Sequence, residues 1–248
     1  MKVIEFGNKN NEIIMLLHGG GLSWWHYKEV AYYLEKDYYV ILPILDGHSN
    51  SDHSFTSIED NALEIIEYID KNFNGSILFM GGCSLGAQIL VEILSLRKNI
   101  CKYSFIESAL VFPMRITHLL TKSMLDMSYG LINKKWFSKL QFKELKIKDE
   151  YFNDYYKDSC NITKNDMISF LEANTDYKIK DSIKDIESKV FIFVGNKEQK
   201  IMIKSAIHLN KLIPNSVLEI LNMYHGEFSM NHAEEYVHKM LDIIKNHL

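Results

Sequence analysis

The chain has 248 residues, of which 47% are hydrophobic, so it is long enough to bury a sizeable core as one large α/β domain or as a domain with an insertion. A net charge of −4 argues against nucleic acid as a partner. No apolar run approaches the roughly 18 residues that span a bilayer, and no long apolar segment follows the first lysine as it would in a signal peptide. Three cysteines without metal-type spacing suit a reducing compartment, so we expect a cytoplasmic protein with no stable membrane anchor.

In the first 110 residues, short apolar runs alternate with stretches of helical spacing. Strands are predicted near 1–7, 11–17, 38–42, 76–80 and 103–107, and helices over 24–34, 57–73 and 88–94. Ser23 is a plausible N-cap of the first helix, and Ser57 with Asp60 opens the second in a capping-box pattern. Such alternation is typical of a mostly parallel sheet covered by helices on both faces.

The alternation stops between about residues 111 and 177, where the pattern is helical with no convincing strand. It resumes with a strand at 189–195, a helix at 202–212, a strand at 217–221 and a helix at 233–245. No internal repeat or linker separates the helical stretch from its surroundings. The sequence therefore predicts one α/β domain from residues 1–110 and 178–248, with residues 111–177 inserted into it as a helical cap.

The segment Gly82-Cys83-Ser84-Leu85-Gly86-Ala87 lies where the strand predicted at 76–80 meets the helix predicted at 88–94. Strand, tight turn and helix around Gly-x-Ser-x-Gly form the pattern of a nucleophile elbow. Small residues two positions before and after the serine let strand and helix approach closely, and the turn exposes the Ser84 hydroxyl at a helix N-terminus. Cys83 is the rival nucleophile. In that register Leu85 would stand where a small residue is needed, so we expect Cys83 to be a buried apolar side chain.

Four motifs, in this order, resemble the α/β-hydrolase family over nearly the whole chain: His18-Gly19-Gly20-Gly21, the elbow at Ser84, Gly195-Asn196-Lys197-Glu198 and His225-Gly226. The predicted cap also falls where family members with a cap carry theirs. The resemblance implies an α/β-hydrolase fold, with a mostly parallel sheet and a helical cap, and an esterase-like or lipase-like serine hydrolase activity. Residues 44–51 keep the Gly-His and the final serine of one family stretch but lack its leading acid and second glycine, so we expect a different loop shape there.

A serine hydroxyl needs an adjacent base to act as a nucleophile. His225 follows the last predicted strand, where the resemblance implies the base that takes and returns the proton. Glu198 follows the strand at 189–195 and is the carboxylate we expect to orient that base, although most family members have aspartate there. Glu107, at the end of the preceding strand, is the alternative acid. Weaker options are Glu227 and Asp46.

The resemblance also implies an oxyanion hole of backbone N–H groups, which stabilises the negative charge that develops on a substrate carbonyl oxygen. One donor is expected from Leu85, directly after the serine. The other is expected from Gly20, with Gly21 as a further candidate, because glycines let the chain bring donors close to the developing charge.

Apolar side chains of the predicted cap recur at helical spacing: Phe112, Met114, Ile116, Leu119, Leu120, Met124, Leu125, Met127, Tyr129 and Leu131. We expect most of them to pack on the core and the rest to line an apolar, Met-rich pocket that faces Ser84. Such a pocket favours an uncharged acyl or alkyl group. The lysines between residues 134 and 148 are expected to form the solvated outer face of the cap, and Trp24 and Trp25 to pack in the core.

These features predict a hydrolase that cleaves a small-molecule carboxylic ester, with a small to medium apolar acyl or alkyl group, through an acyl-enzyme on Ser84. Thioester, lactone, amide or carbon–carbon bond hydrolysis by the same residues is an alternative, and so is a ligand-binding protein without turnover. No metal or organic cofactor is expected, because the sequence has no metal-type His or Cys cluster and no glycine-rich dinucleotide loop.

Overall fold

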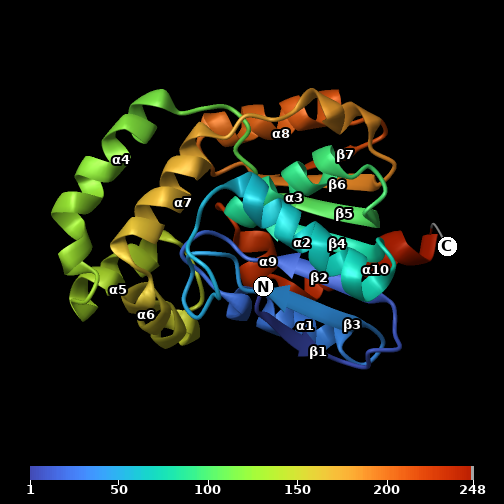
Figure 1. The fold of residues 1–248 in the computed structure, drawn as a ribbon, viewed down its shortest axis with the longest axis horizontal. Helices are drawn as coiled ribbons and strands as arrows, with labels where there is room; N and C mark the ends of the chain where they lie inside the picture. The colour runs from blue at the N-terminus through green and yellow to red at the C-terminus, as the bar shows by residue number, and fades with distance from the viewer. Residues whose placement is uncertain (247–248) are drawn as a thin grey trace.

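The computed structural model describes residues 1–246 and contains a seven-stranded sheet with the spatial order β1-β3-β2-β4-β5-β6-β7 (Figure 1). The strands are β1 (Val3–Phe6), β2 (Ile13–Leu17), β3 (Tyr39–Pro43), β4 (Ile77–Cys83), β5 (Cys101–Glu107), β6 (Lys189–Gly195) and β7 (Val217–Leu221). Strand β1 pairs antiparallel with β3, and the other neighbouring pairs are parallel. The prediction of a mostly parallel sheet is confirmed.

Both faces of the central strands of this sheet are buried. In β2, Ile14 and Leu16 pack into one hydrophobic cluster and Met15 and Leu17 into another, because successive side chains of a strand point to opposite faces. A strand that is buried on both faces appears in the sequence as a continuous apolar run. This is why short apolar segments predict most of the strands.

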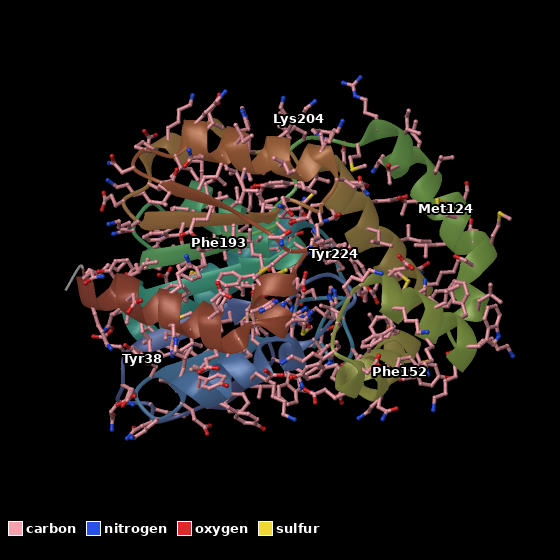
Figure 2. The ribbon with its side chains drawn as sticks, turned by 180° about the vertical axis from the view of Figure 1, so that it is seen from behind. Tyr38, Met124, Phe152, Phe193, Lys204 and Tyr224 are labelled. Atoms are coloured by element: carbon pink, nitrogen blue, oxygen red, sulfur yellow. The ribbon has the colours of Figure 1, made fainter. Side chains whose placement is uncertain are left out.

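Helices cover the two faces. On one face lie α2 (Ile58–Phe73), α3 (Leu85–Leu96) and α8 (Lys200–Leu212), of which α2 and α3 cross in front of the sheet in Figure 1. On the other face lie α1 (Lys28–Leu34) and α10 (Ala233–Asn246), which Figure 2 shows from behind. Helix α3 packs between β4 and α2, and it is buried at every residue from Leu85 to Ser95. The residues after the elbow serine therefore have a rigid support.

Local signals at the helix ends are partly confirmed. The Ser57 hydroxyl accepts the Asp60 N–H at the start of α2, as the capping-box pattern predicts. Ser23 takes the predicted N-cap position, with extended backbone before the 3-10 turn Trp24–Tyr27, but its side chain makes no capping hydrogen bond. The sequence did not predict α9 (Glu227–Asn231), a helix too short to show helical periodicity.

Between β5 and β6 the chain forms α4 (Arg115–Ser128), α5 (Lys135–Glu144), α6 (Phe152–Asn161) and α7 (Lys164–Asp176), which stand together beside one end of the sheet (Figure 1). We call residues 111–177 the helical block. It is helical where the sequence predicts helix; its standing as a cap distinct from the core domain stays a prediction. Within residues 1–246, no helix combines the length and the apolar character needed to cross a bilayer.

Trp25 ties the helical block to the core. Its ring is buried and stacks on Tyr151, and its indole N–H donates to the Asp158 carboxylate of α6 over 2.8 Å. The expectation that Trp25 packs inside the protein is confirmed. The contact holds one end of the block against the segment that follows the His18 motif.

The apolar face of α4 differs from the prediction. Its mostly exposed side chains are Ile116, Leu119, Met124 and Met127, and Figure 2 shows Met124 at the outer edge of the molecule. Helix α4 packs on α7 through another side, which carries the buried Thr121 and places His118 Nδ1 3.2 Å from the Glu172 carbonyl oxygen. For these four side chains, the expectation that they pack on the core or face Ser84 is wrong. Phe112 and Met114, which precede α4, do pack against the core, as expected. Helical spacing reveals an apolar stripe, but it does not reveal which side of the helix a neighbour covers.

Candidate active site

Ser84 occupies a strained turn between β4 and α3, with φ of 54° and ψ of −115°. A Cβ atom on Gly82 would lie 2.5 Å from the Gly86 carbonyl oxygen, and one on Gly86 would lie 2.2 Å from the Leu17 carbonyl oxygen. Strand and helix can cross at this distance only if both positions are glycine. The Gly-x-Ser-x-Gly pattern is thus a steric requirement of the turn, which holds Ser84, a non-glycine residue, at a strained positive φ.

A chain of two hydrogen bonds connects Ser84, His225 and Glu198. The Ser84 Oγ lies 2.9 Å from His225 Nε2, and His225 Nδ1 lies 2.6 Å from Glu198 Oε2. Because a carboxylate only accepts, Nδ1 carries a proton and donates it to Glu198. In the neutral ring Nε2 is then the acceptor, which faces the serine O–H. The structure therefore brings together the three side chains that the sequence predicts for the site.

Glu198 is held by more than the histidine. Its Oε1 accepts the Gly195 N–H over 2.7 Å and the Ser108 O–H over 2.8 Å, and its side chain has no exposed surface. At Gly195 a Cβ would lie 2.1 Å from the Met223 carbonyl oxygen, so glycine is required for the loops after β6 and β7 to close on each other. These contacts fix the orientation of the carboxylate toward His225.

The electrostatics of this pair favour a charged His225. Burial lowers the pKa of His225, but the hydrogen bond and the negative charge of Glu198 outweigh it and raise this pKa above its usual range. Burial likewise raises the pKa of Glu198, and its contacts with His225, Gly195 and Ser108 together lower it below the ordinary value. Glu198 therefore stabilises the imidazolium that forms when His225 takes a proton.

The alternative acids form neither a hydrogen bond nor an ion pair with His225. Glu107 is buried, and its carboxylate accepts the N–H groups of Phe228 and Ser229 at the start of α9. Burial raises the pKa of Glu107 to about 7. Glu227 accepts the backbone N–H of the residue before His225, over 2.7 Å. Asp46 lies in the loop after β3, where burial raises its pKa to about 6.

Two buried imidazoles take the backbone N–H groups on either side of Gly20. Gly19 N–H donates to His26 Nδ1 over 3.2 Å, and Gly21 N–H donates to His48 Nε2 over 3.0 Å. Gly21 is therefore already engaged. Among residues 1–246 no acceptor takes the Gly20 N–H, and a Cβ on Gly20 would lie 3.5 Å from the Leu85 Cβ. The two predicted oxyanion-hole residues are thus neighbours on the side of the site where Ser84 lies.

Burial keeps the histidines of this loop neutral. It lowers the pKa of His26 to about 3 and that of His48 to about 4, and it lowers the pKa of His18 well below the usual range. In a neutral ring the nitrogen that accepts an N–H leaves the other nitrogen to donate. His26 Nε2–H therefore donates to Ser229 Oγ over 2.9 Å, and His48 Nδ1–H to the Asp46 carbonyl over 3.0 Å.

The supporting roles of His26, His48 and Ser229 are not foreseen from the sequence. His26 and Ser229 are 203 positions apart, and neither belongs to a motif that would draw attention to it. His48 does carry a signal, since it is the histidine of the Gly-His pair in residues 44–51. Cys83 is buried and burial raises its pKa well above the ordinary value, so its sulfur is a poor nucleophile.

Two cavities meet at Ser84 and His225. The smaller has a volume of about 130 Å³, and its further lining residues include Gly20, Leu22, Ile147 and Met230. The larger has a volume of about 610 Å³, and its lining includes Leu110, Met114, Met202, Tyr224, Lys146 and Lys197. Leu145 and Lys146 line both, so the segment after α5 divides the two cavities. In the described part of the chain, no group of three or more His, Cys, Asp or Glu side chains is arranged to hold a metal ion.

Comparison with known proteins bears on the family and the fold. A family model described as serine aminopeptidase, S33, matches residues 8–229. No curated protein sequence matches the chain.

Solved structures are similar over almost the whole chain. An esterase from Exiguobacterium antarcticum has a TM-score of 0.81 at 19% identity, with 98% of this chain and 94% of the other covered. A thermophilic esterase from Thermogutta terrifontis has a TM-score of 0.79 at 11% identity, with 99% and 93% covered. An enol-lactonase from Burkholderia xenovorans LB400 has a TM-score of 0.80 at 12% identity, with 98% and 96% covered. At these identities the likeness shows the α/β-hydrolase fold alone.

Proposed function

We propose that this chain, which belongs to the serine aminopeptidase S33 family of α/β hydrolases, cleaves a carboxylic ester through a covalent acyl-enzyme on Ser84. The observation that carries the proposal is the hydrogen-bonded chain from Ser84 through His225 to Glu198, at distances of 2.9 and 2.6 Å. A side chain that is both exposed to a cavity and hydrogen-bonded to an oriented base is an activated nucleophile.

In the first half of the reaction, His225 Nε2 takes the proton of Ser84 as Oγ attacks the ester carbonyl carbon. The carbonyl electron pair moves to oxygen, and we assign the Gly20 and Leu85 N–H groups to the stabilisation of that charge. The intermediate then collapses, the carbonyl re-forms, and the bond to the leaving oxygen breaks. His225 gives its proton to the departing alcohol, which leaves an acyl group on Ser84.

In the second half, a water molecule takes the place of the alcohol. His225 accepts one proton of the water, and the resulting hydroxide adds to the acyl carbon. Collapse of this second intermediate releases the carboxylic acid and returns the proton to Ser84. Glu198 stays ionised throughout, holds the ring orientation and stabilises the imidazolium.

The size of the smaller cavity favours a short acyl group. It is about 130 Å³ in volume, close to the roughly 150 Å³ of an apolar cavity that holds one benzene molecule. Leu22, Ile147 and Met230 supply its apolar wall next to Gly20. An acyl chain of a few carbons that enters this cavity would leave the alcohol part of the ester to the larger one.

Cleavage of a small peptide is the second candidate, because the matching family is described as a serine aminopeptidase. An aminopeptidase must hold the ammonium group of its substrate. The larger cavity offers Lys146 and Lys197 as well as Glu144, a mixed set that favours no cation. We therefore place the ester first.

The test is hydrolysis of p-nitrophenyl esters from acetate to decanoate, with Ser84→Ala as the control and an alanyl p-nitroanilide as the peptide-like probe. We expect the highest kcat/KM for the short acyl chains and a fall in kcat of about 10⁶-fold in Ser84→Ala. Labelling by a fluorophosphonate should be lost in the same variant. Absence of both ester turnover and Ser84 labelling would overturn the proposal, and a preference for the anilide would replace it with peptide cleavage.

A further inference from the structure

Two lysine side chains converge on one aromatic ring in the lining of the larger cavity. Lys197 Nζ lies 4.9 Å from the centre of the Tyr224 ring, and Lys146 Nζ lies 5.9 Å from it. Both lysines and Tyr224 line the cavity that Ser84 and His225 also line. A cation over a tyrosine face is attracted by the ring quadrupole, so the ring holds both ammonium groups at the wall of the cavity.

Within the described part of the chain, these ammonium groups have no acidic partner. Neither Lys146 nor Lys197 forms an ion pair with any residue in the range 1–246. Of the carboxylates that line the cavity, Glu198 is already bound to His225, and Glu144 forms no ion pair with the described residues either. Two like charges on one ring repel each other unless an anion lies between or beside them.

The three side chains come from anchored segments. The Lys146 carbonyl accepts the Asn231 side-chain N–H over 2.6 Å, which ties the segment after α5 to α9. The Tyr224 N–H donates to Glu227 over 2.7 Å, and the Lys197 N–H donates to the Met223 carbonyl over 3.2 Å. The convergence therefore does not depend on the conformation of one free loop.

We propose that Lys146 and Lys197 bind an anionic group, a carboxylate or a phosphate, on the alcohol side of the ester. The inference rests on the proposed function, and it names the class of substrate: a short apolar acyl group joined to an alcohol that carries an anionic group. The smaller cavity presents Leu22, Ile147 and Met230 beside Gly20. Lys146 lies on the boundary and lines both cavities, whereas Lys197 and Tyr224 line only the larger one. We therefore assign the acyl group to the smaller cavity and the anionic leaving group to the larger one.

The test compares three acetate esters with one leaving-group frame: 4-acetoxybenzoate, 4-acetoxyphenyl phosphate and the neutral methyl 4-acetoxybenzoate. For each, kcat/KM is divided by the rate constant for hydrolysis by hydroxide, which removes the differences in intrinsic reactivity. We expect at least one anionic ester to be preferred over the neutral ester by about tenfold, which is the effect of one charge-assisted contact, and the preferred anion tells carboxylate from phosphate. This preference should weaken as salt is added.

Variants assign the preference to the two lysines. Lys197→Met and Lys146→Met should each lower the anionic-to-neutral ratio severalfold, and Glu144→Gln should raise it, because it removes a negative charge from the same cavity. Lys143→Met is the matched control, since Lys143 lies on the same helix as Glu144 but lines neither cavity. Equal normalised values for all three esters would overturn the inference, as would a preference that both lysine variants retain.

A binding measurement separates this inference from the proposed function. Calorimetry on Ser84→Ala compares 4-hydroxybenzoate and 4-hydroxyphenyl phosphate with methyl 4-hydroxybenzoate. If none of the esters is hydrolysed, tighter binding of an anionic compound that Lys197→Met abolishes still supports the anion site, while the hydrolytic proposal fails. Equal affinity for all three compounds overturns the anion site by itself.

Discussion

The two sides of the candidate active site are built in different ways. On the side of the sheet, Ser84, His225 and Glu198 extend from the ends of β4, β7 and β6, and Glu198 has three hydrogen-bond partners. On the side of the helical block, α4 buries a single residue, Thr121, and turns several large apolar side chains to solvent. Several contacts therefore fix Glu198 on the sheet side, whereas few buried side chains hold α4 on the block side.

This difference suits the sheet side to the chemical step and the helical block to the selection of substrate. Chemistry needs reacting atoms held within fractions of an ångström, and residues 141 positions apart, Ser84 and His225, are brought to hydrogen-bond distance by the ends of parallel strands. Selection of a substrate needs a surface that can vary, and the segment after α5 supplies Leu145 and Lys146 to both cavities. We expect mutations on the sheet side to change kcat and mutations in the block to change which ester is preferred.

The largest effect should come from breaking the sheet side at Glu198. Glu198→Gln should lower kcat by about 10³–10⁴-fold, as loss of the orienting carboxylate does in serine hydrolases. His225 must be neutral to take the proton of Ser84, and Glu198 raises its pKa, so the acid limb of kcat/KM should lie above the ordinary histidine range in the wild type. In Glu198→Gln that limb should move to lower pH. The measurement is the pH profile of p-nitrophenyl acetate hydrolysis between pH 4 and 9.

Glu107→Gln is the matched control for that experiment. It removes a carboxylate that is buried nearby but makes no hydrogen bond to His225, and Gln keeps an oxygen that can accept the Phe228 N–H. We expect a fall in kcat of less than about tenfold. A larger loss in Glu107→Gln than in Glu198→Gln would transfer the role of the acid to Glu107.

A smaller effect on the same side is expected from substitution of His26. Its ring makes no hydrogen bond to Ser84 or to the base His225, but it accepts the Gly19 N–H. His26→Leu leaves the Gly19 N–H without its acceptor, and a loop displaced by about 1 Å can cost up to 10²-fold in rate, so we expect kcat to fall by about 10- to 100-fold. His26→Asn offers an oxygen near the position of Nδ1 and should recover much of that loss. Single-turnover acylation rates check this, with KM as the second readout. Equal acylation rates in both variants and the wild type would contradict a role of this contact in positioning Gly20.

The sequence predicts the sheet side far better than the helical block. The strands, the elbow at Ser84 and the order of Glu198 and His225 follow from local patterns, because strand ends in a parallel sheet converge at one edge. The support from His26 to Ser229 is not predictable in this way, since it joins residues without a shared local pattern. In the block, spacing predicts helices but not the rotation of α4, because either side of an amphipathic helix can be covered once a second helix is present. The contact between Lys146 and Tyr224 cannot be predicted from the sequence for the same reason, because it depends on how the helical block packs against the sheet.

The smallest effect is expected on the outer face of α4, and it tests whether the stripe is free in solution. Leu119 is 75% exposed, and Leu and Gln have similar helix propensities, so Leu119→Gln should change the free energy of unfolding by less than about 0.5 kcal/mol. Ile89 in α3 has no exposed surface, and Ile89→Ala should cost about 2–5 kcal/mol. Urea unfolding of both variants measures the contrast. A loss of 2 kcal/mol or more in Leu119→Gln that grows with protein concentration would mean that another copy of the chain covers the stripe, because only a buried leucine contributes that much. In that case the helical block would also be held by many contacts, some of them supplied by a second copy of the chain.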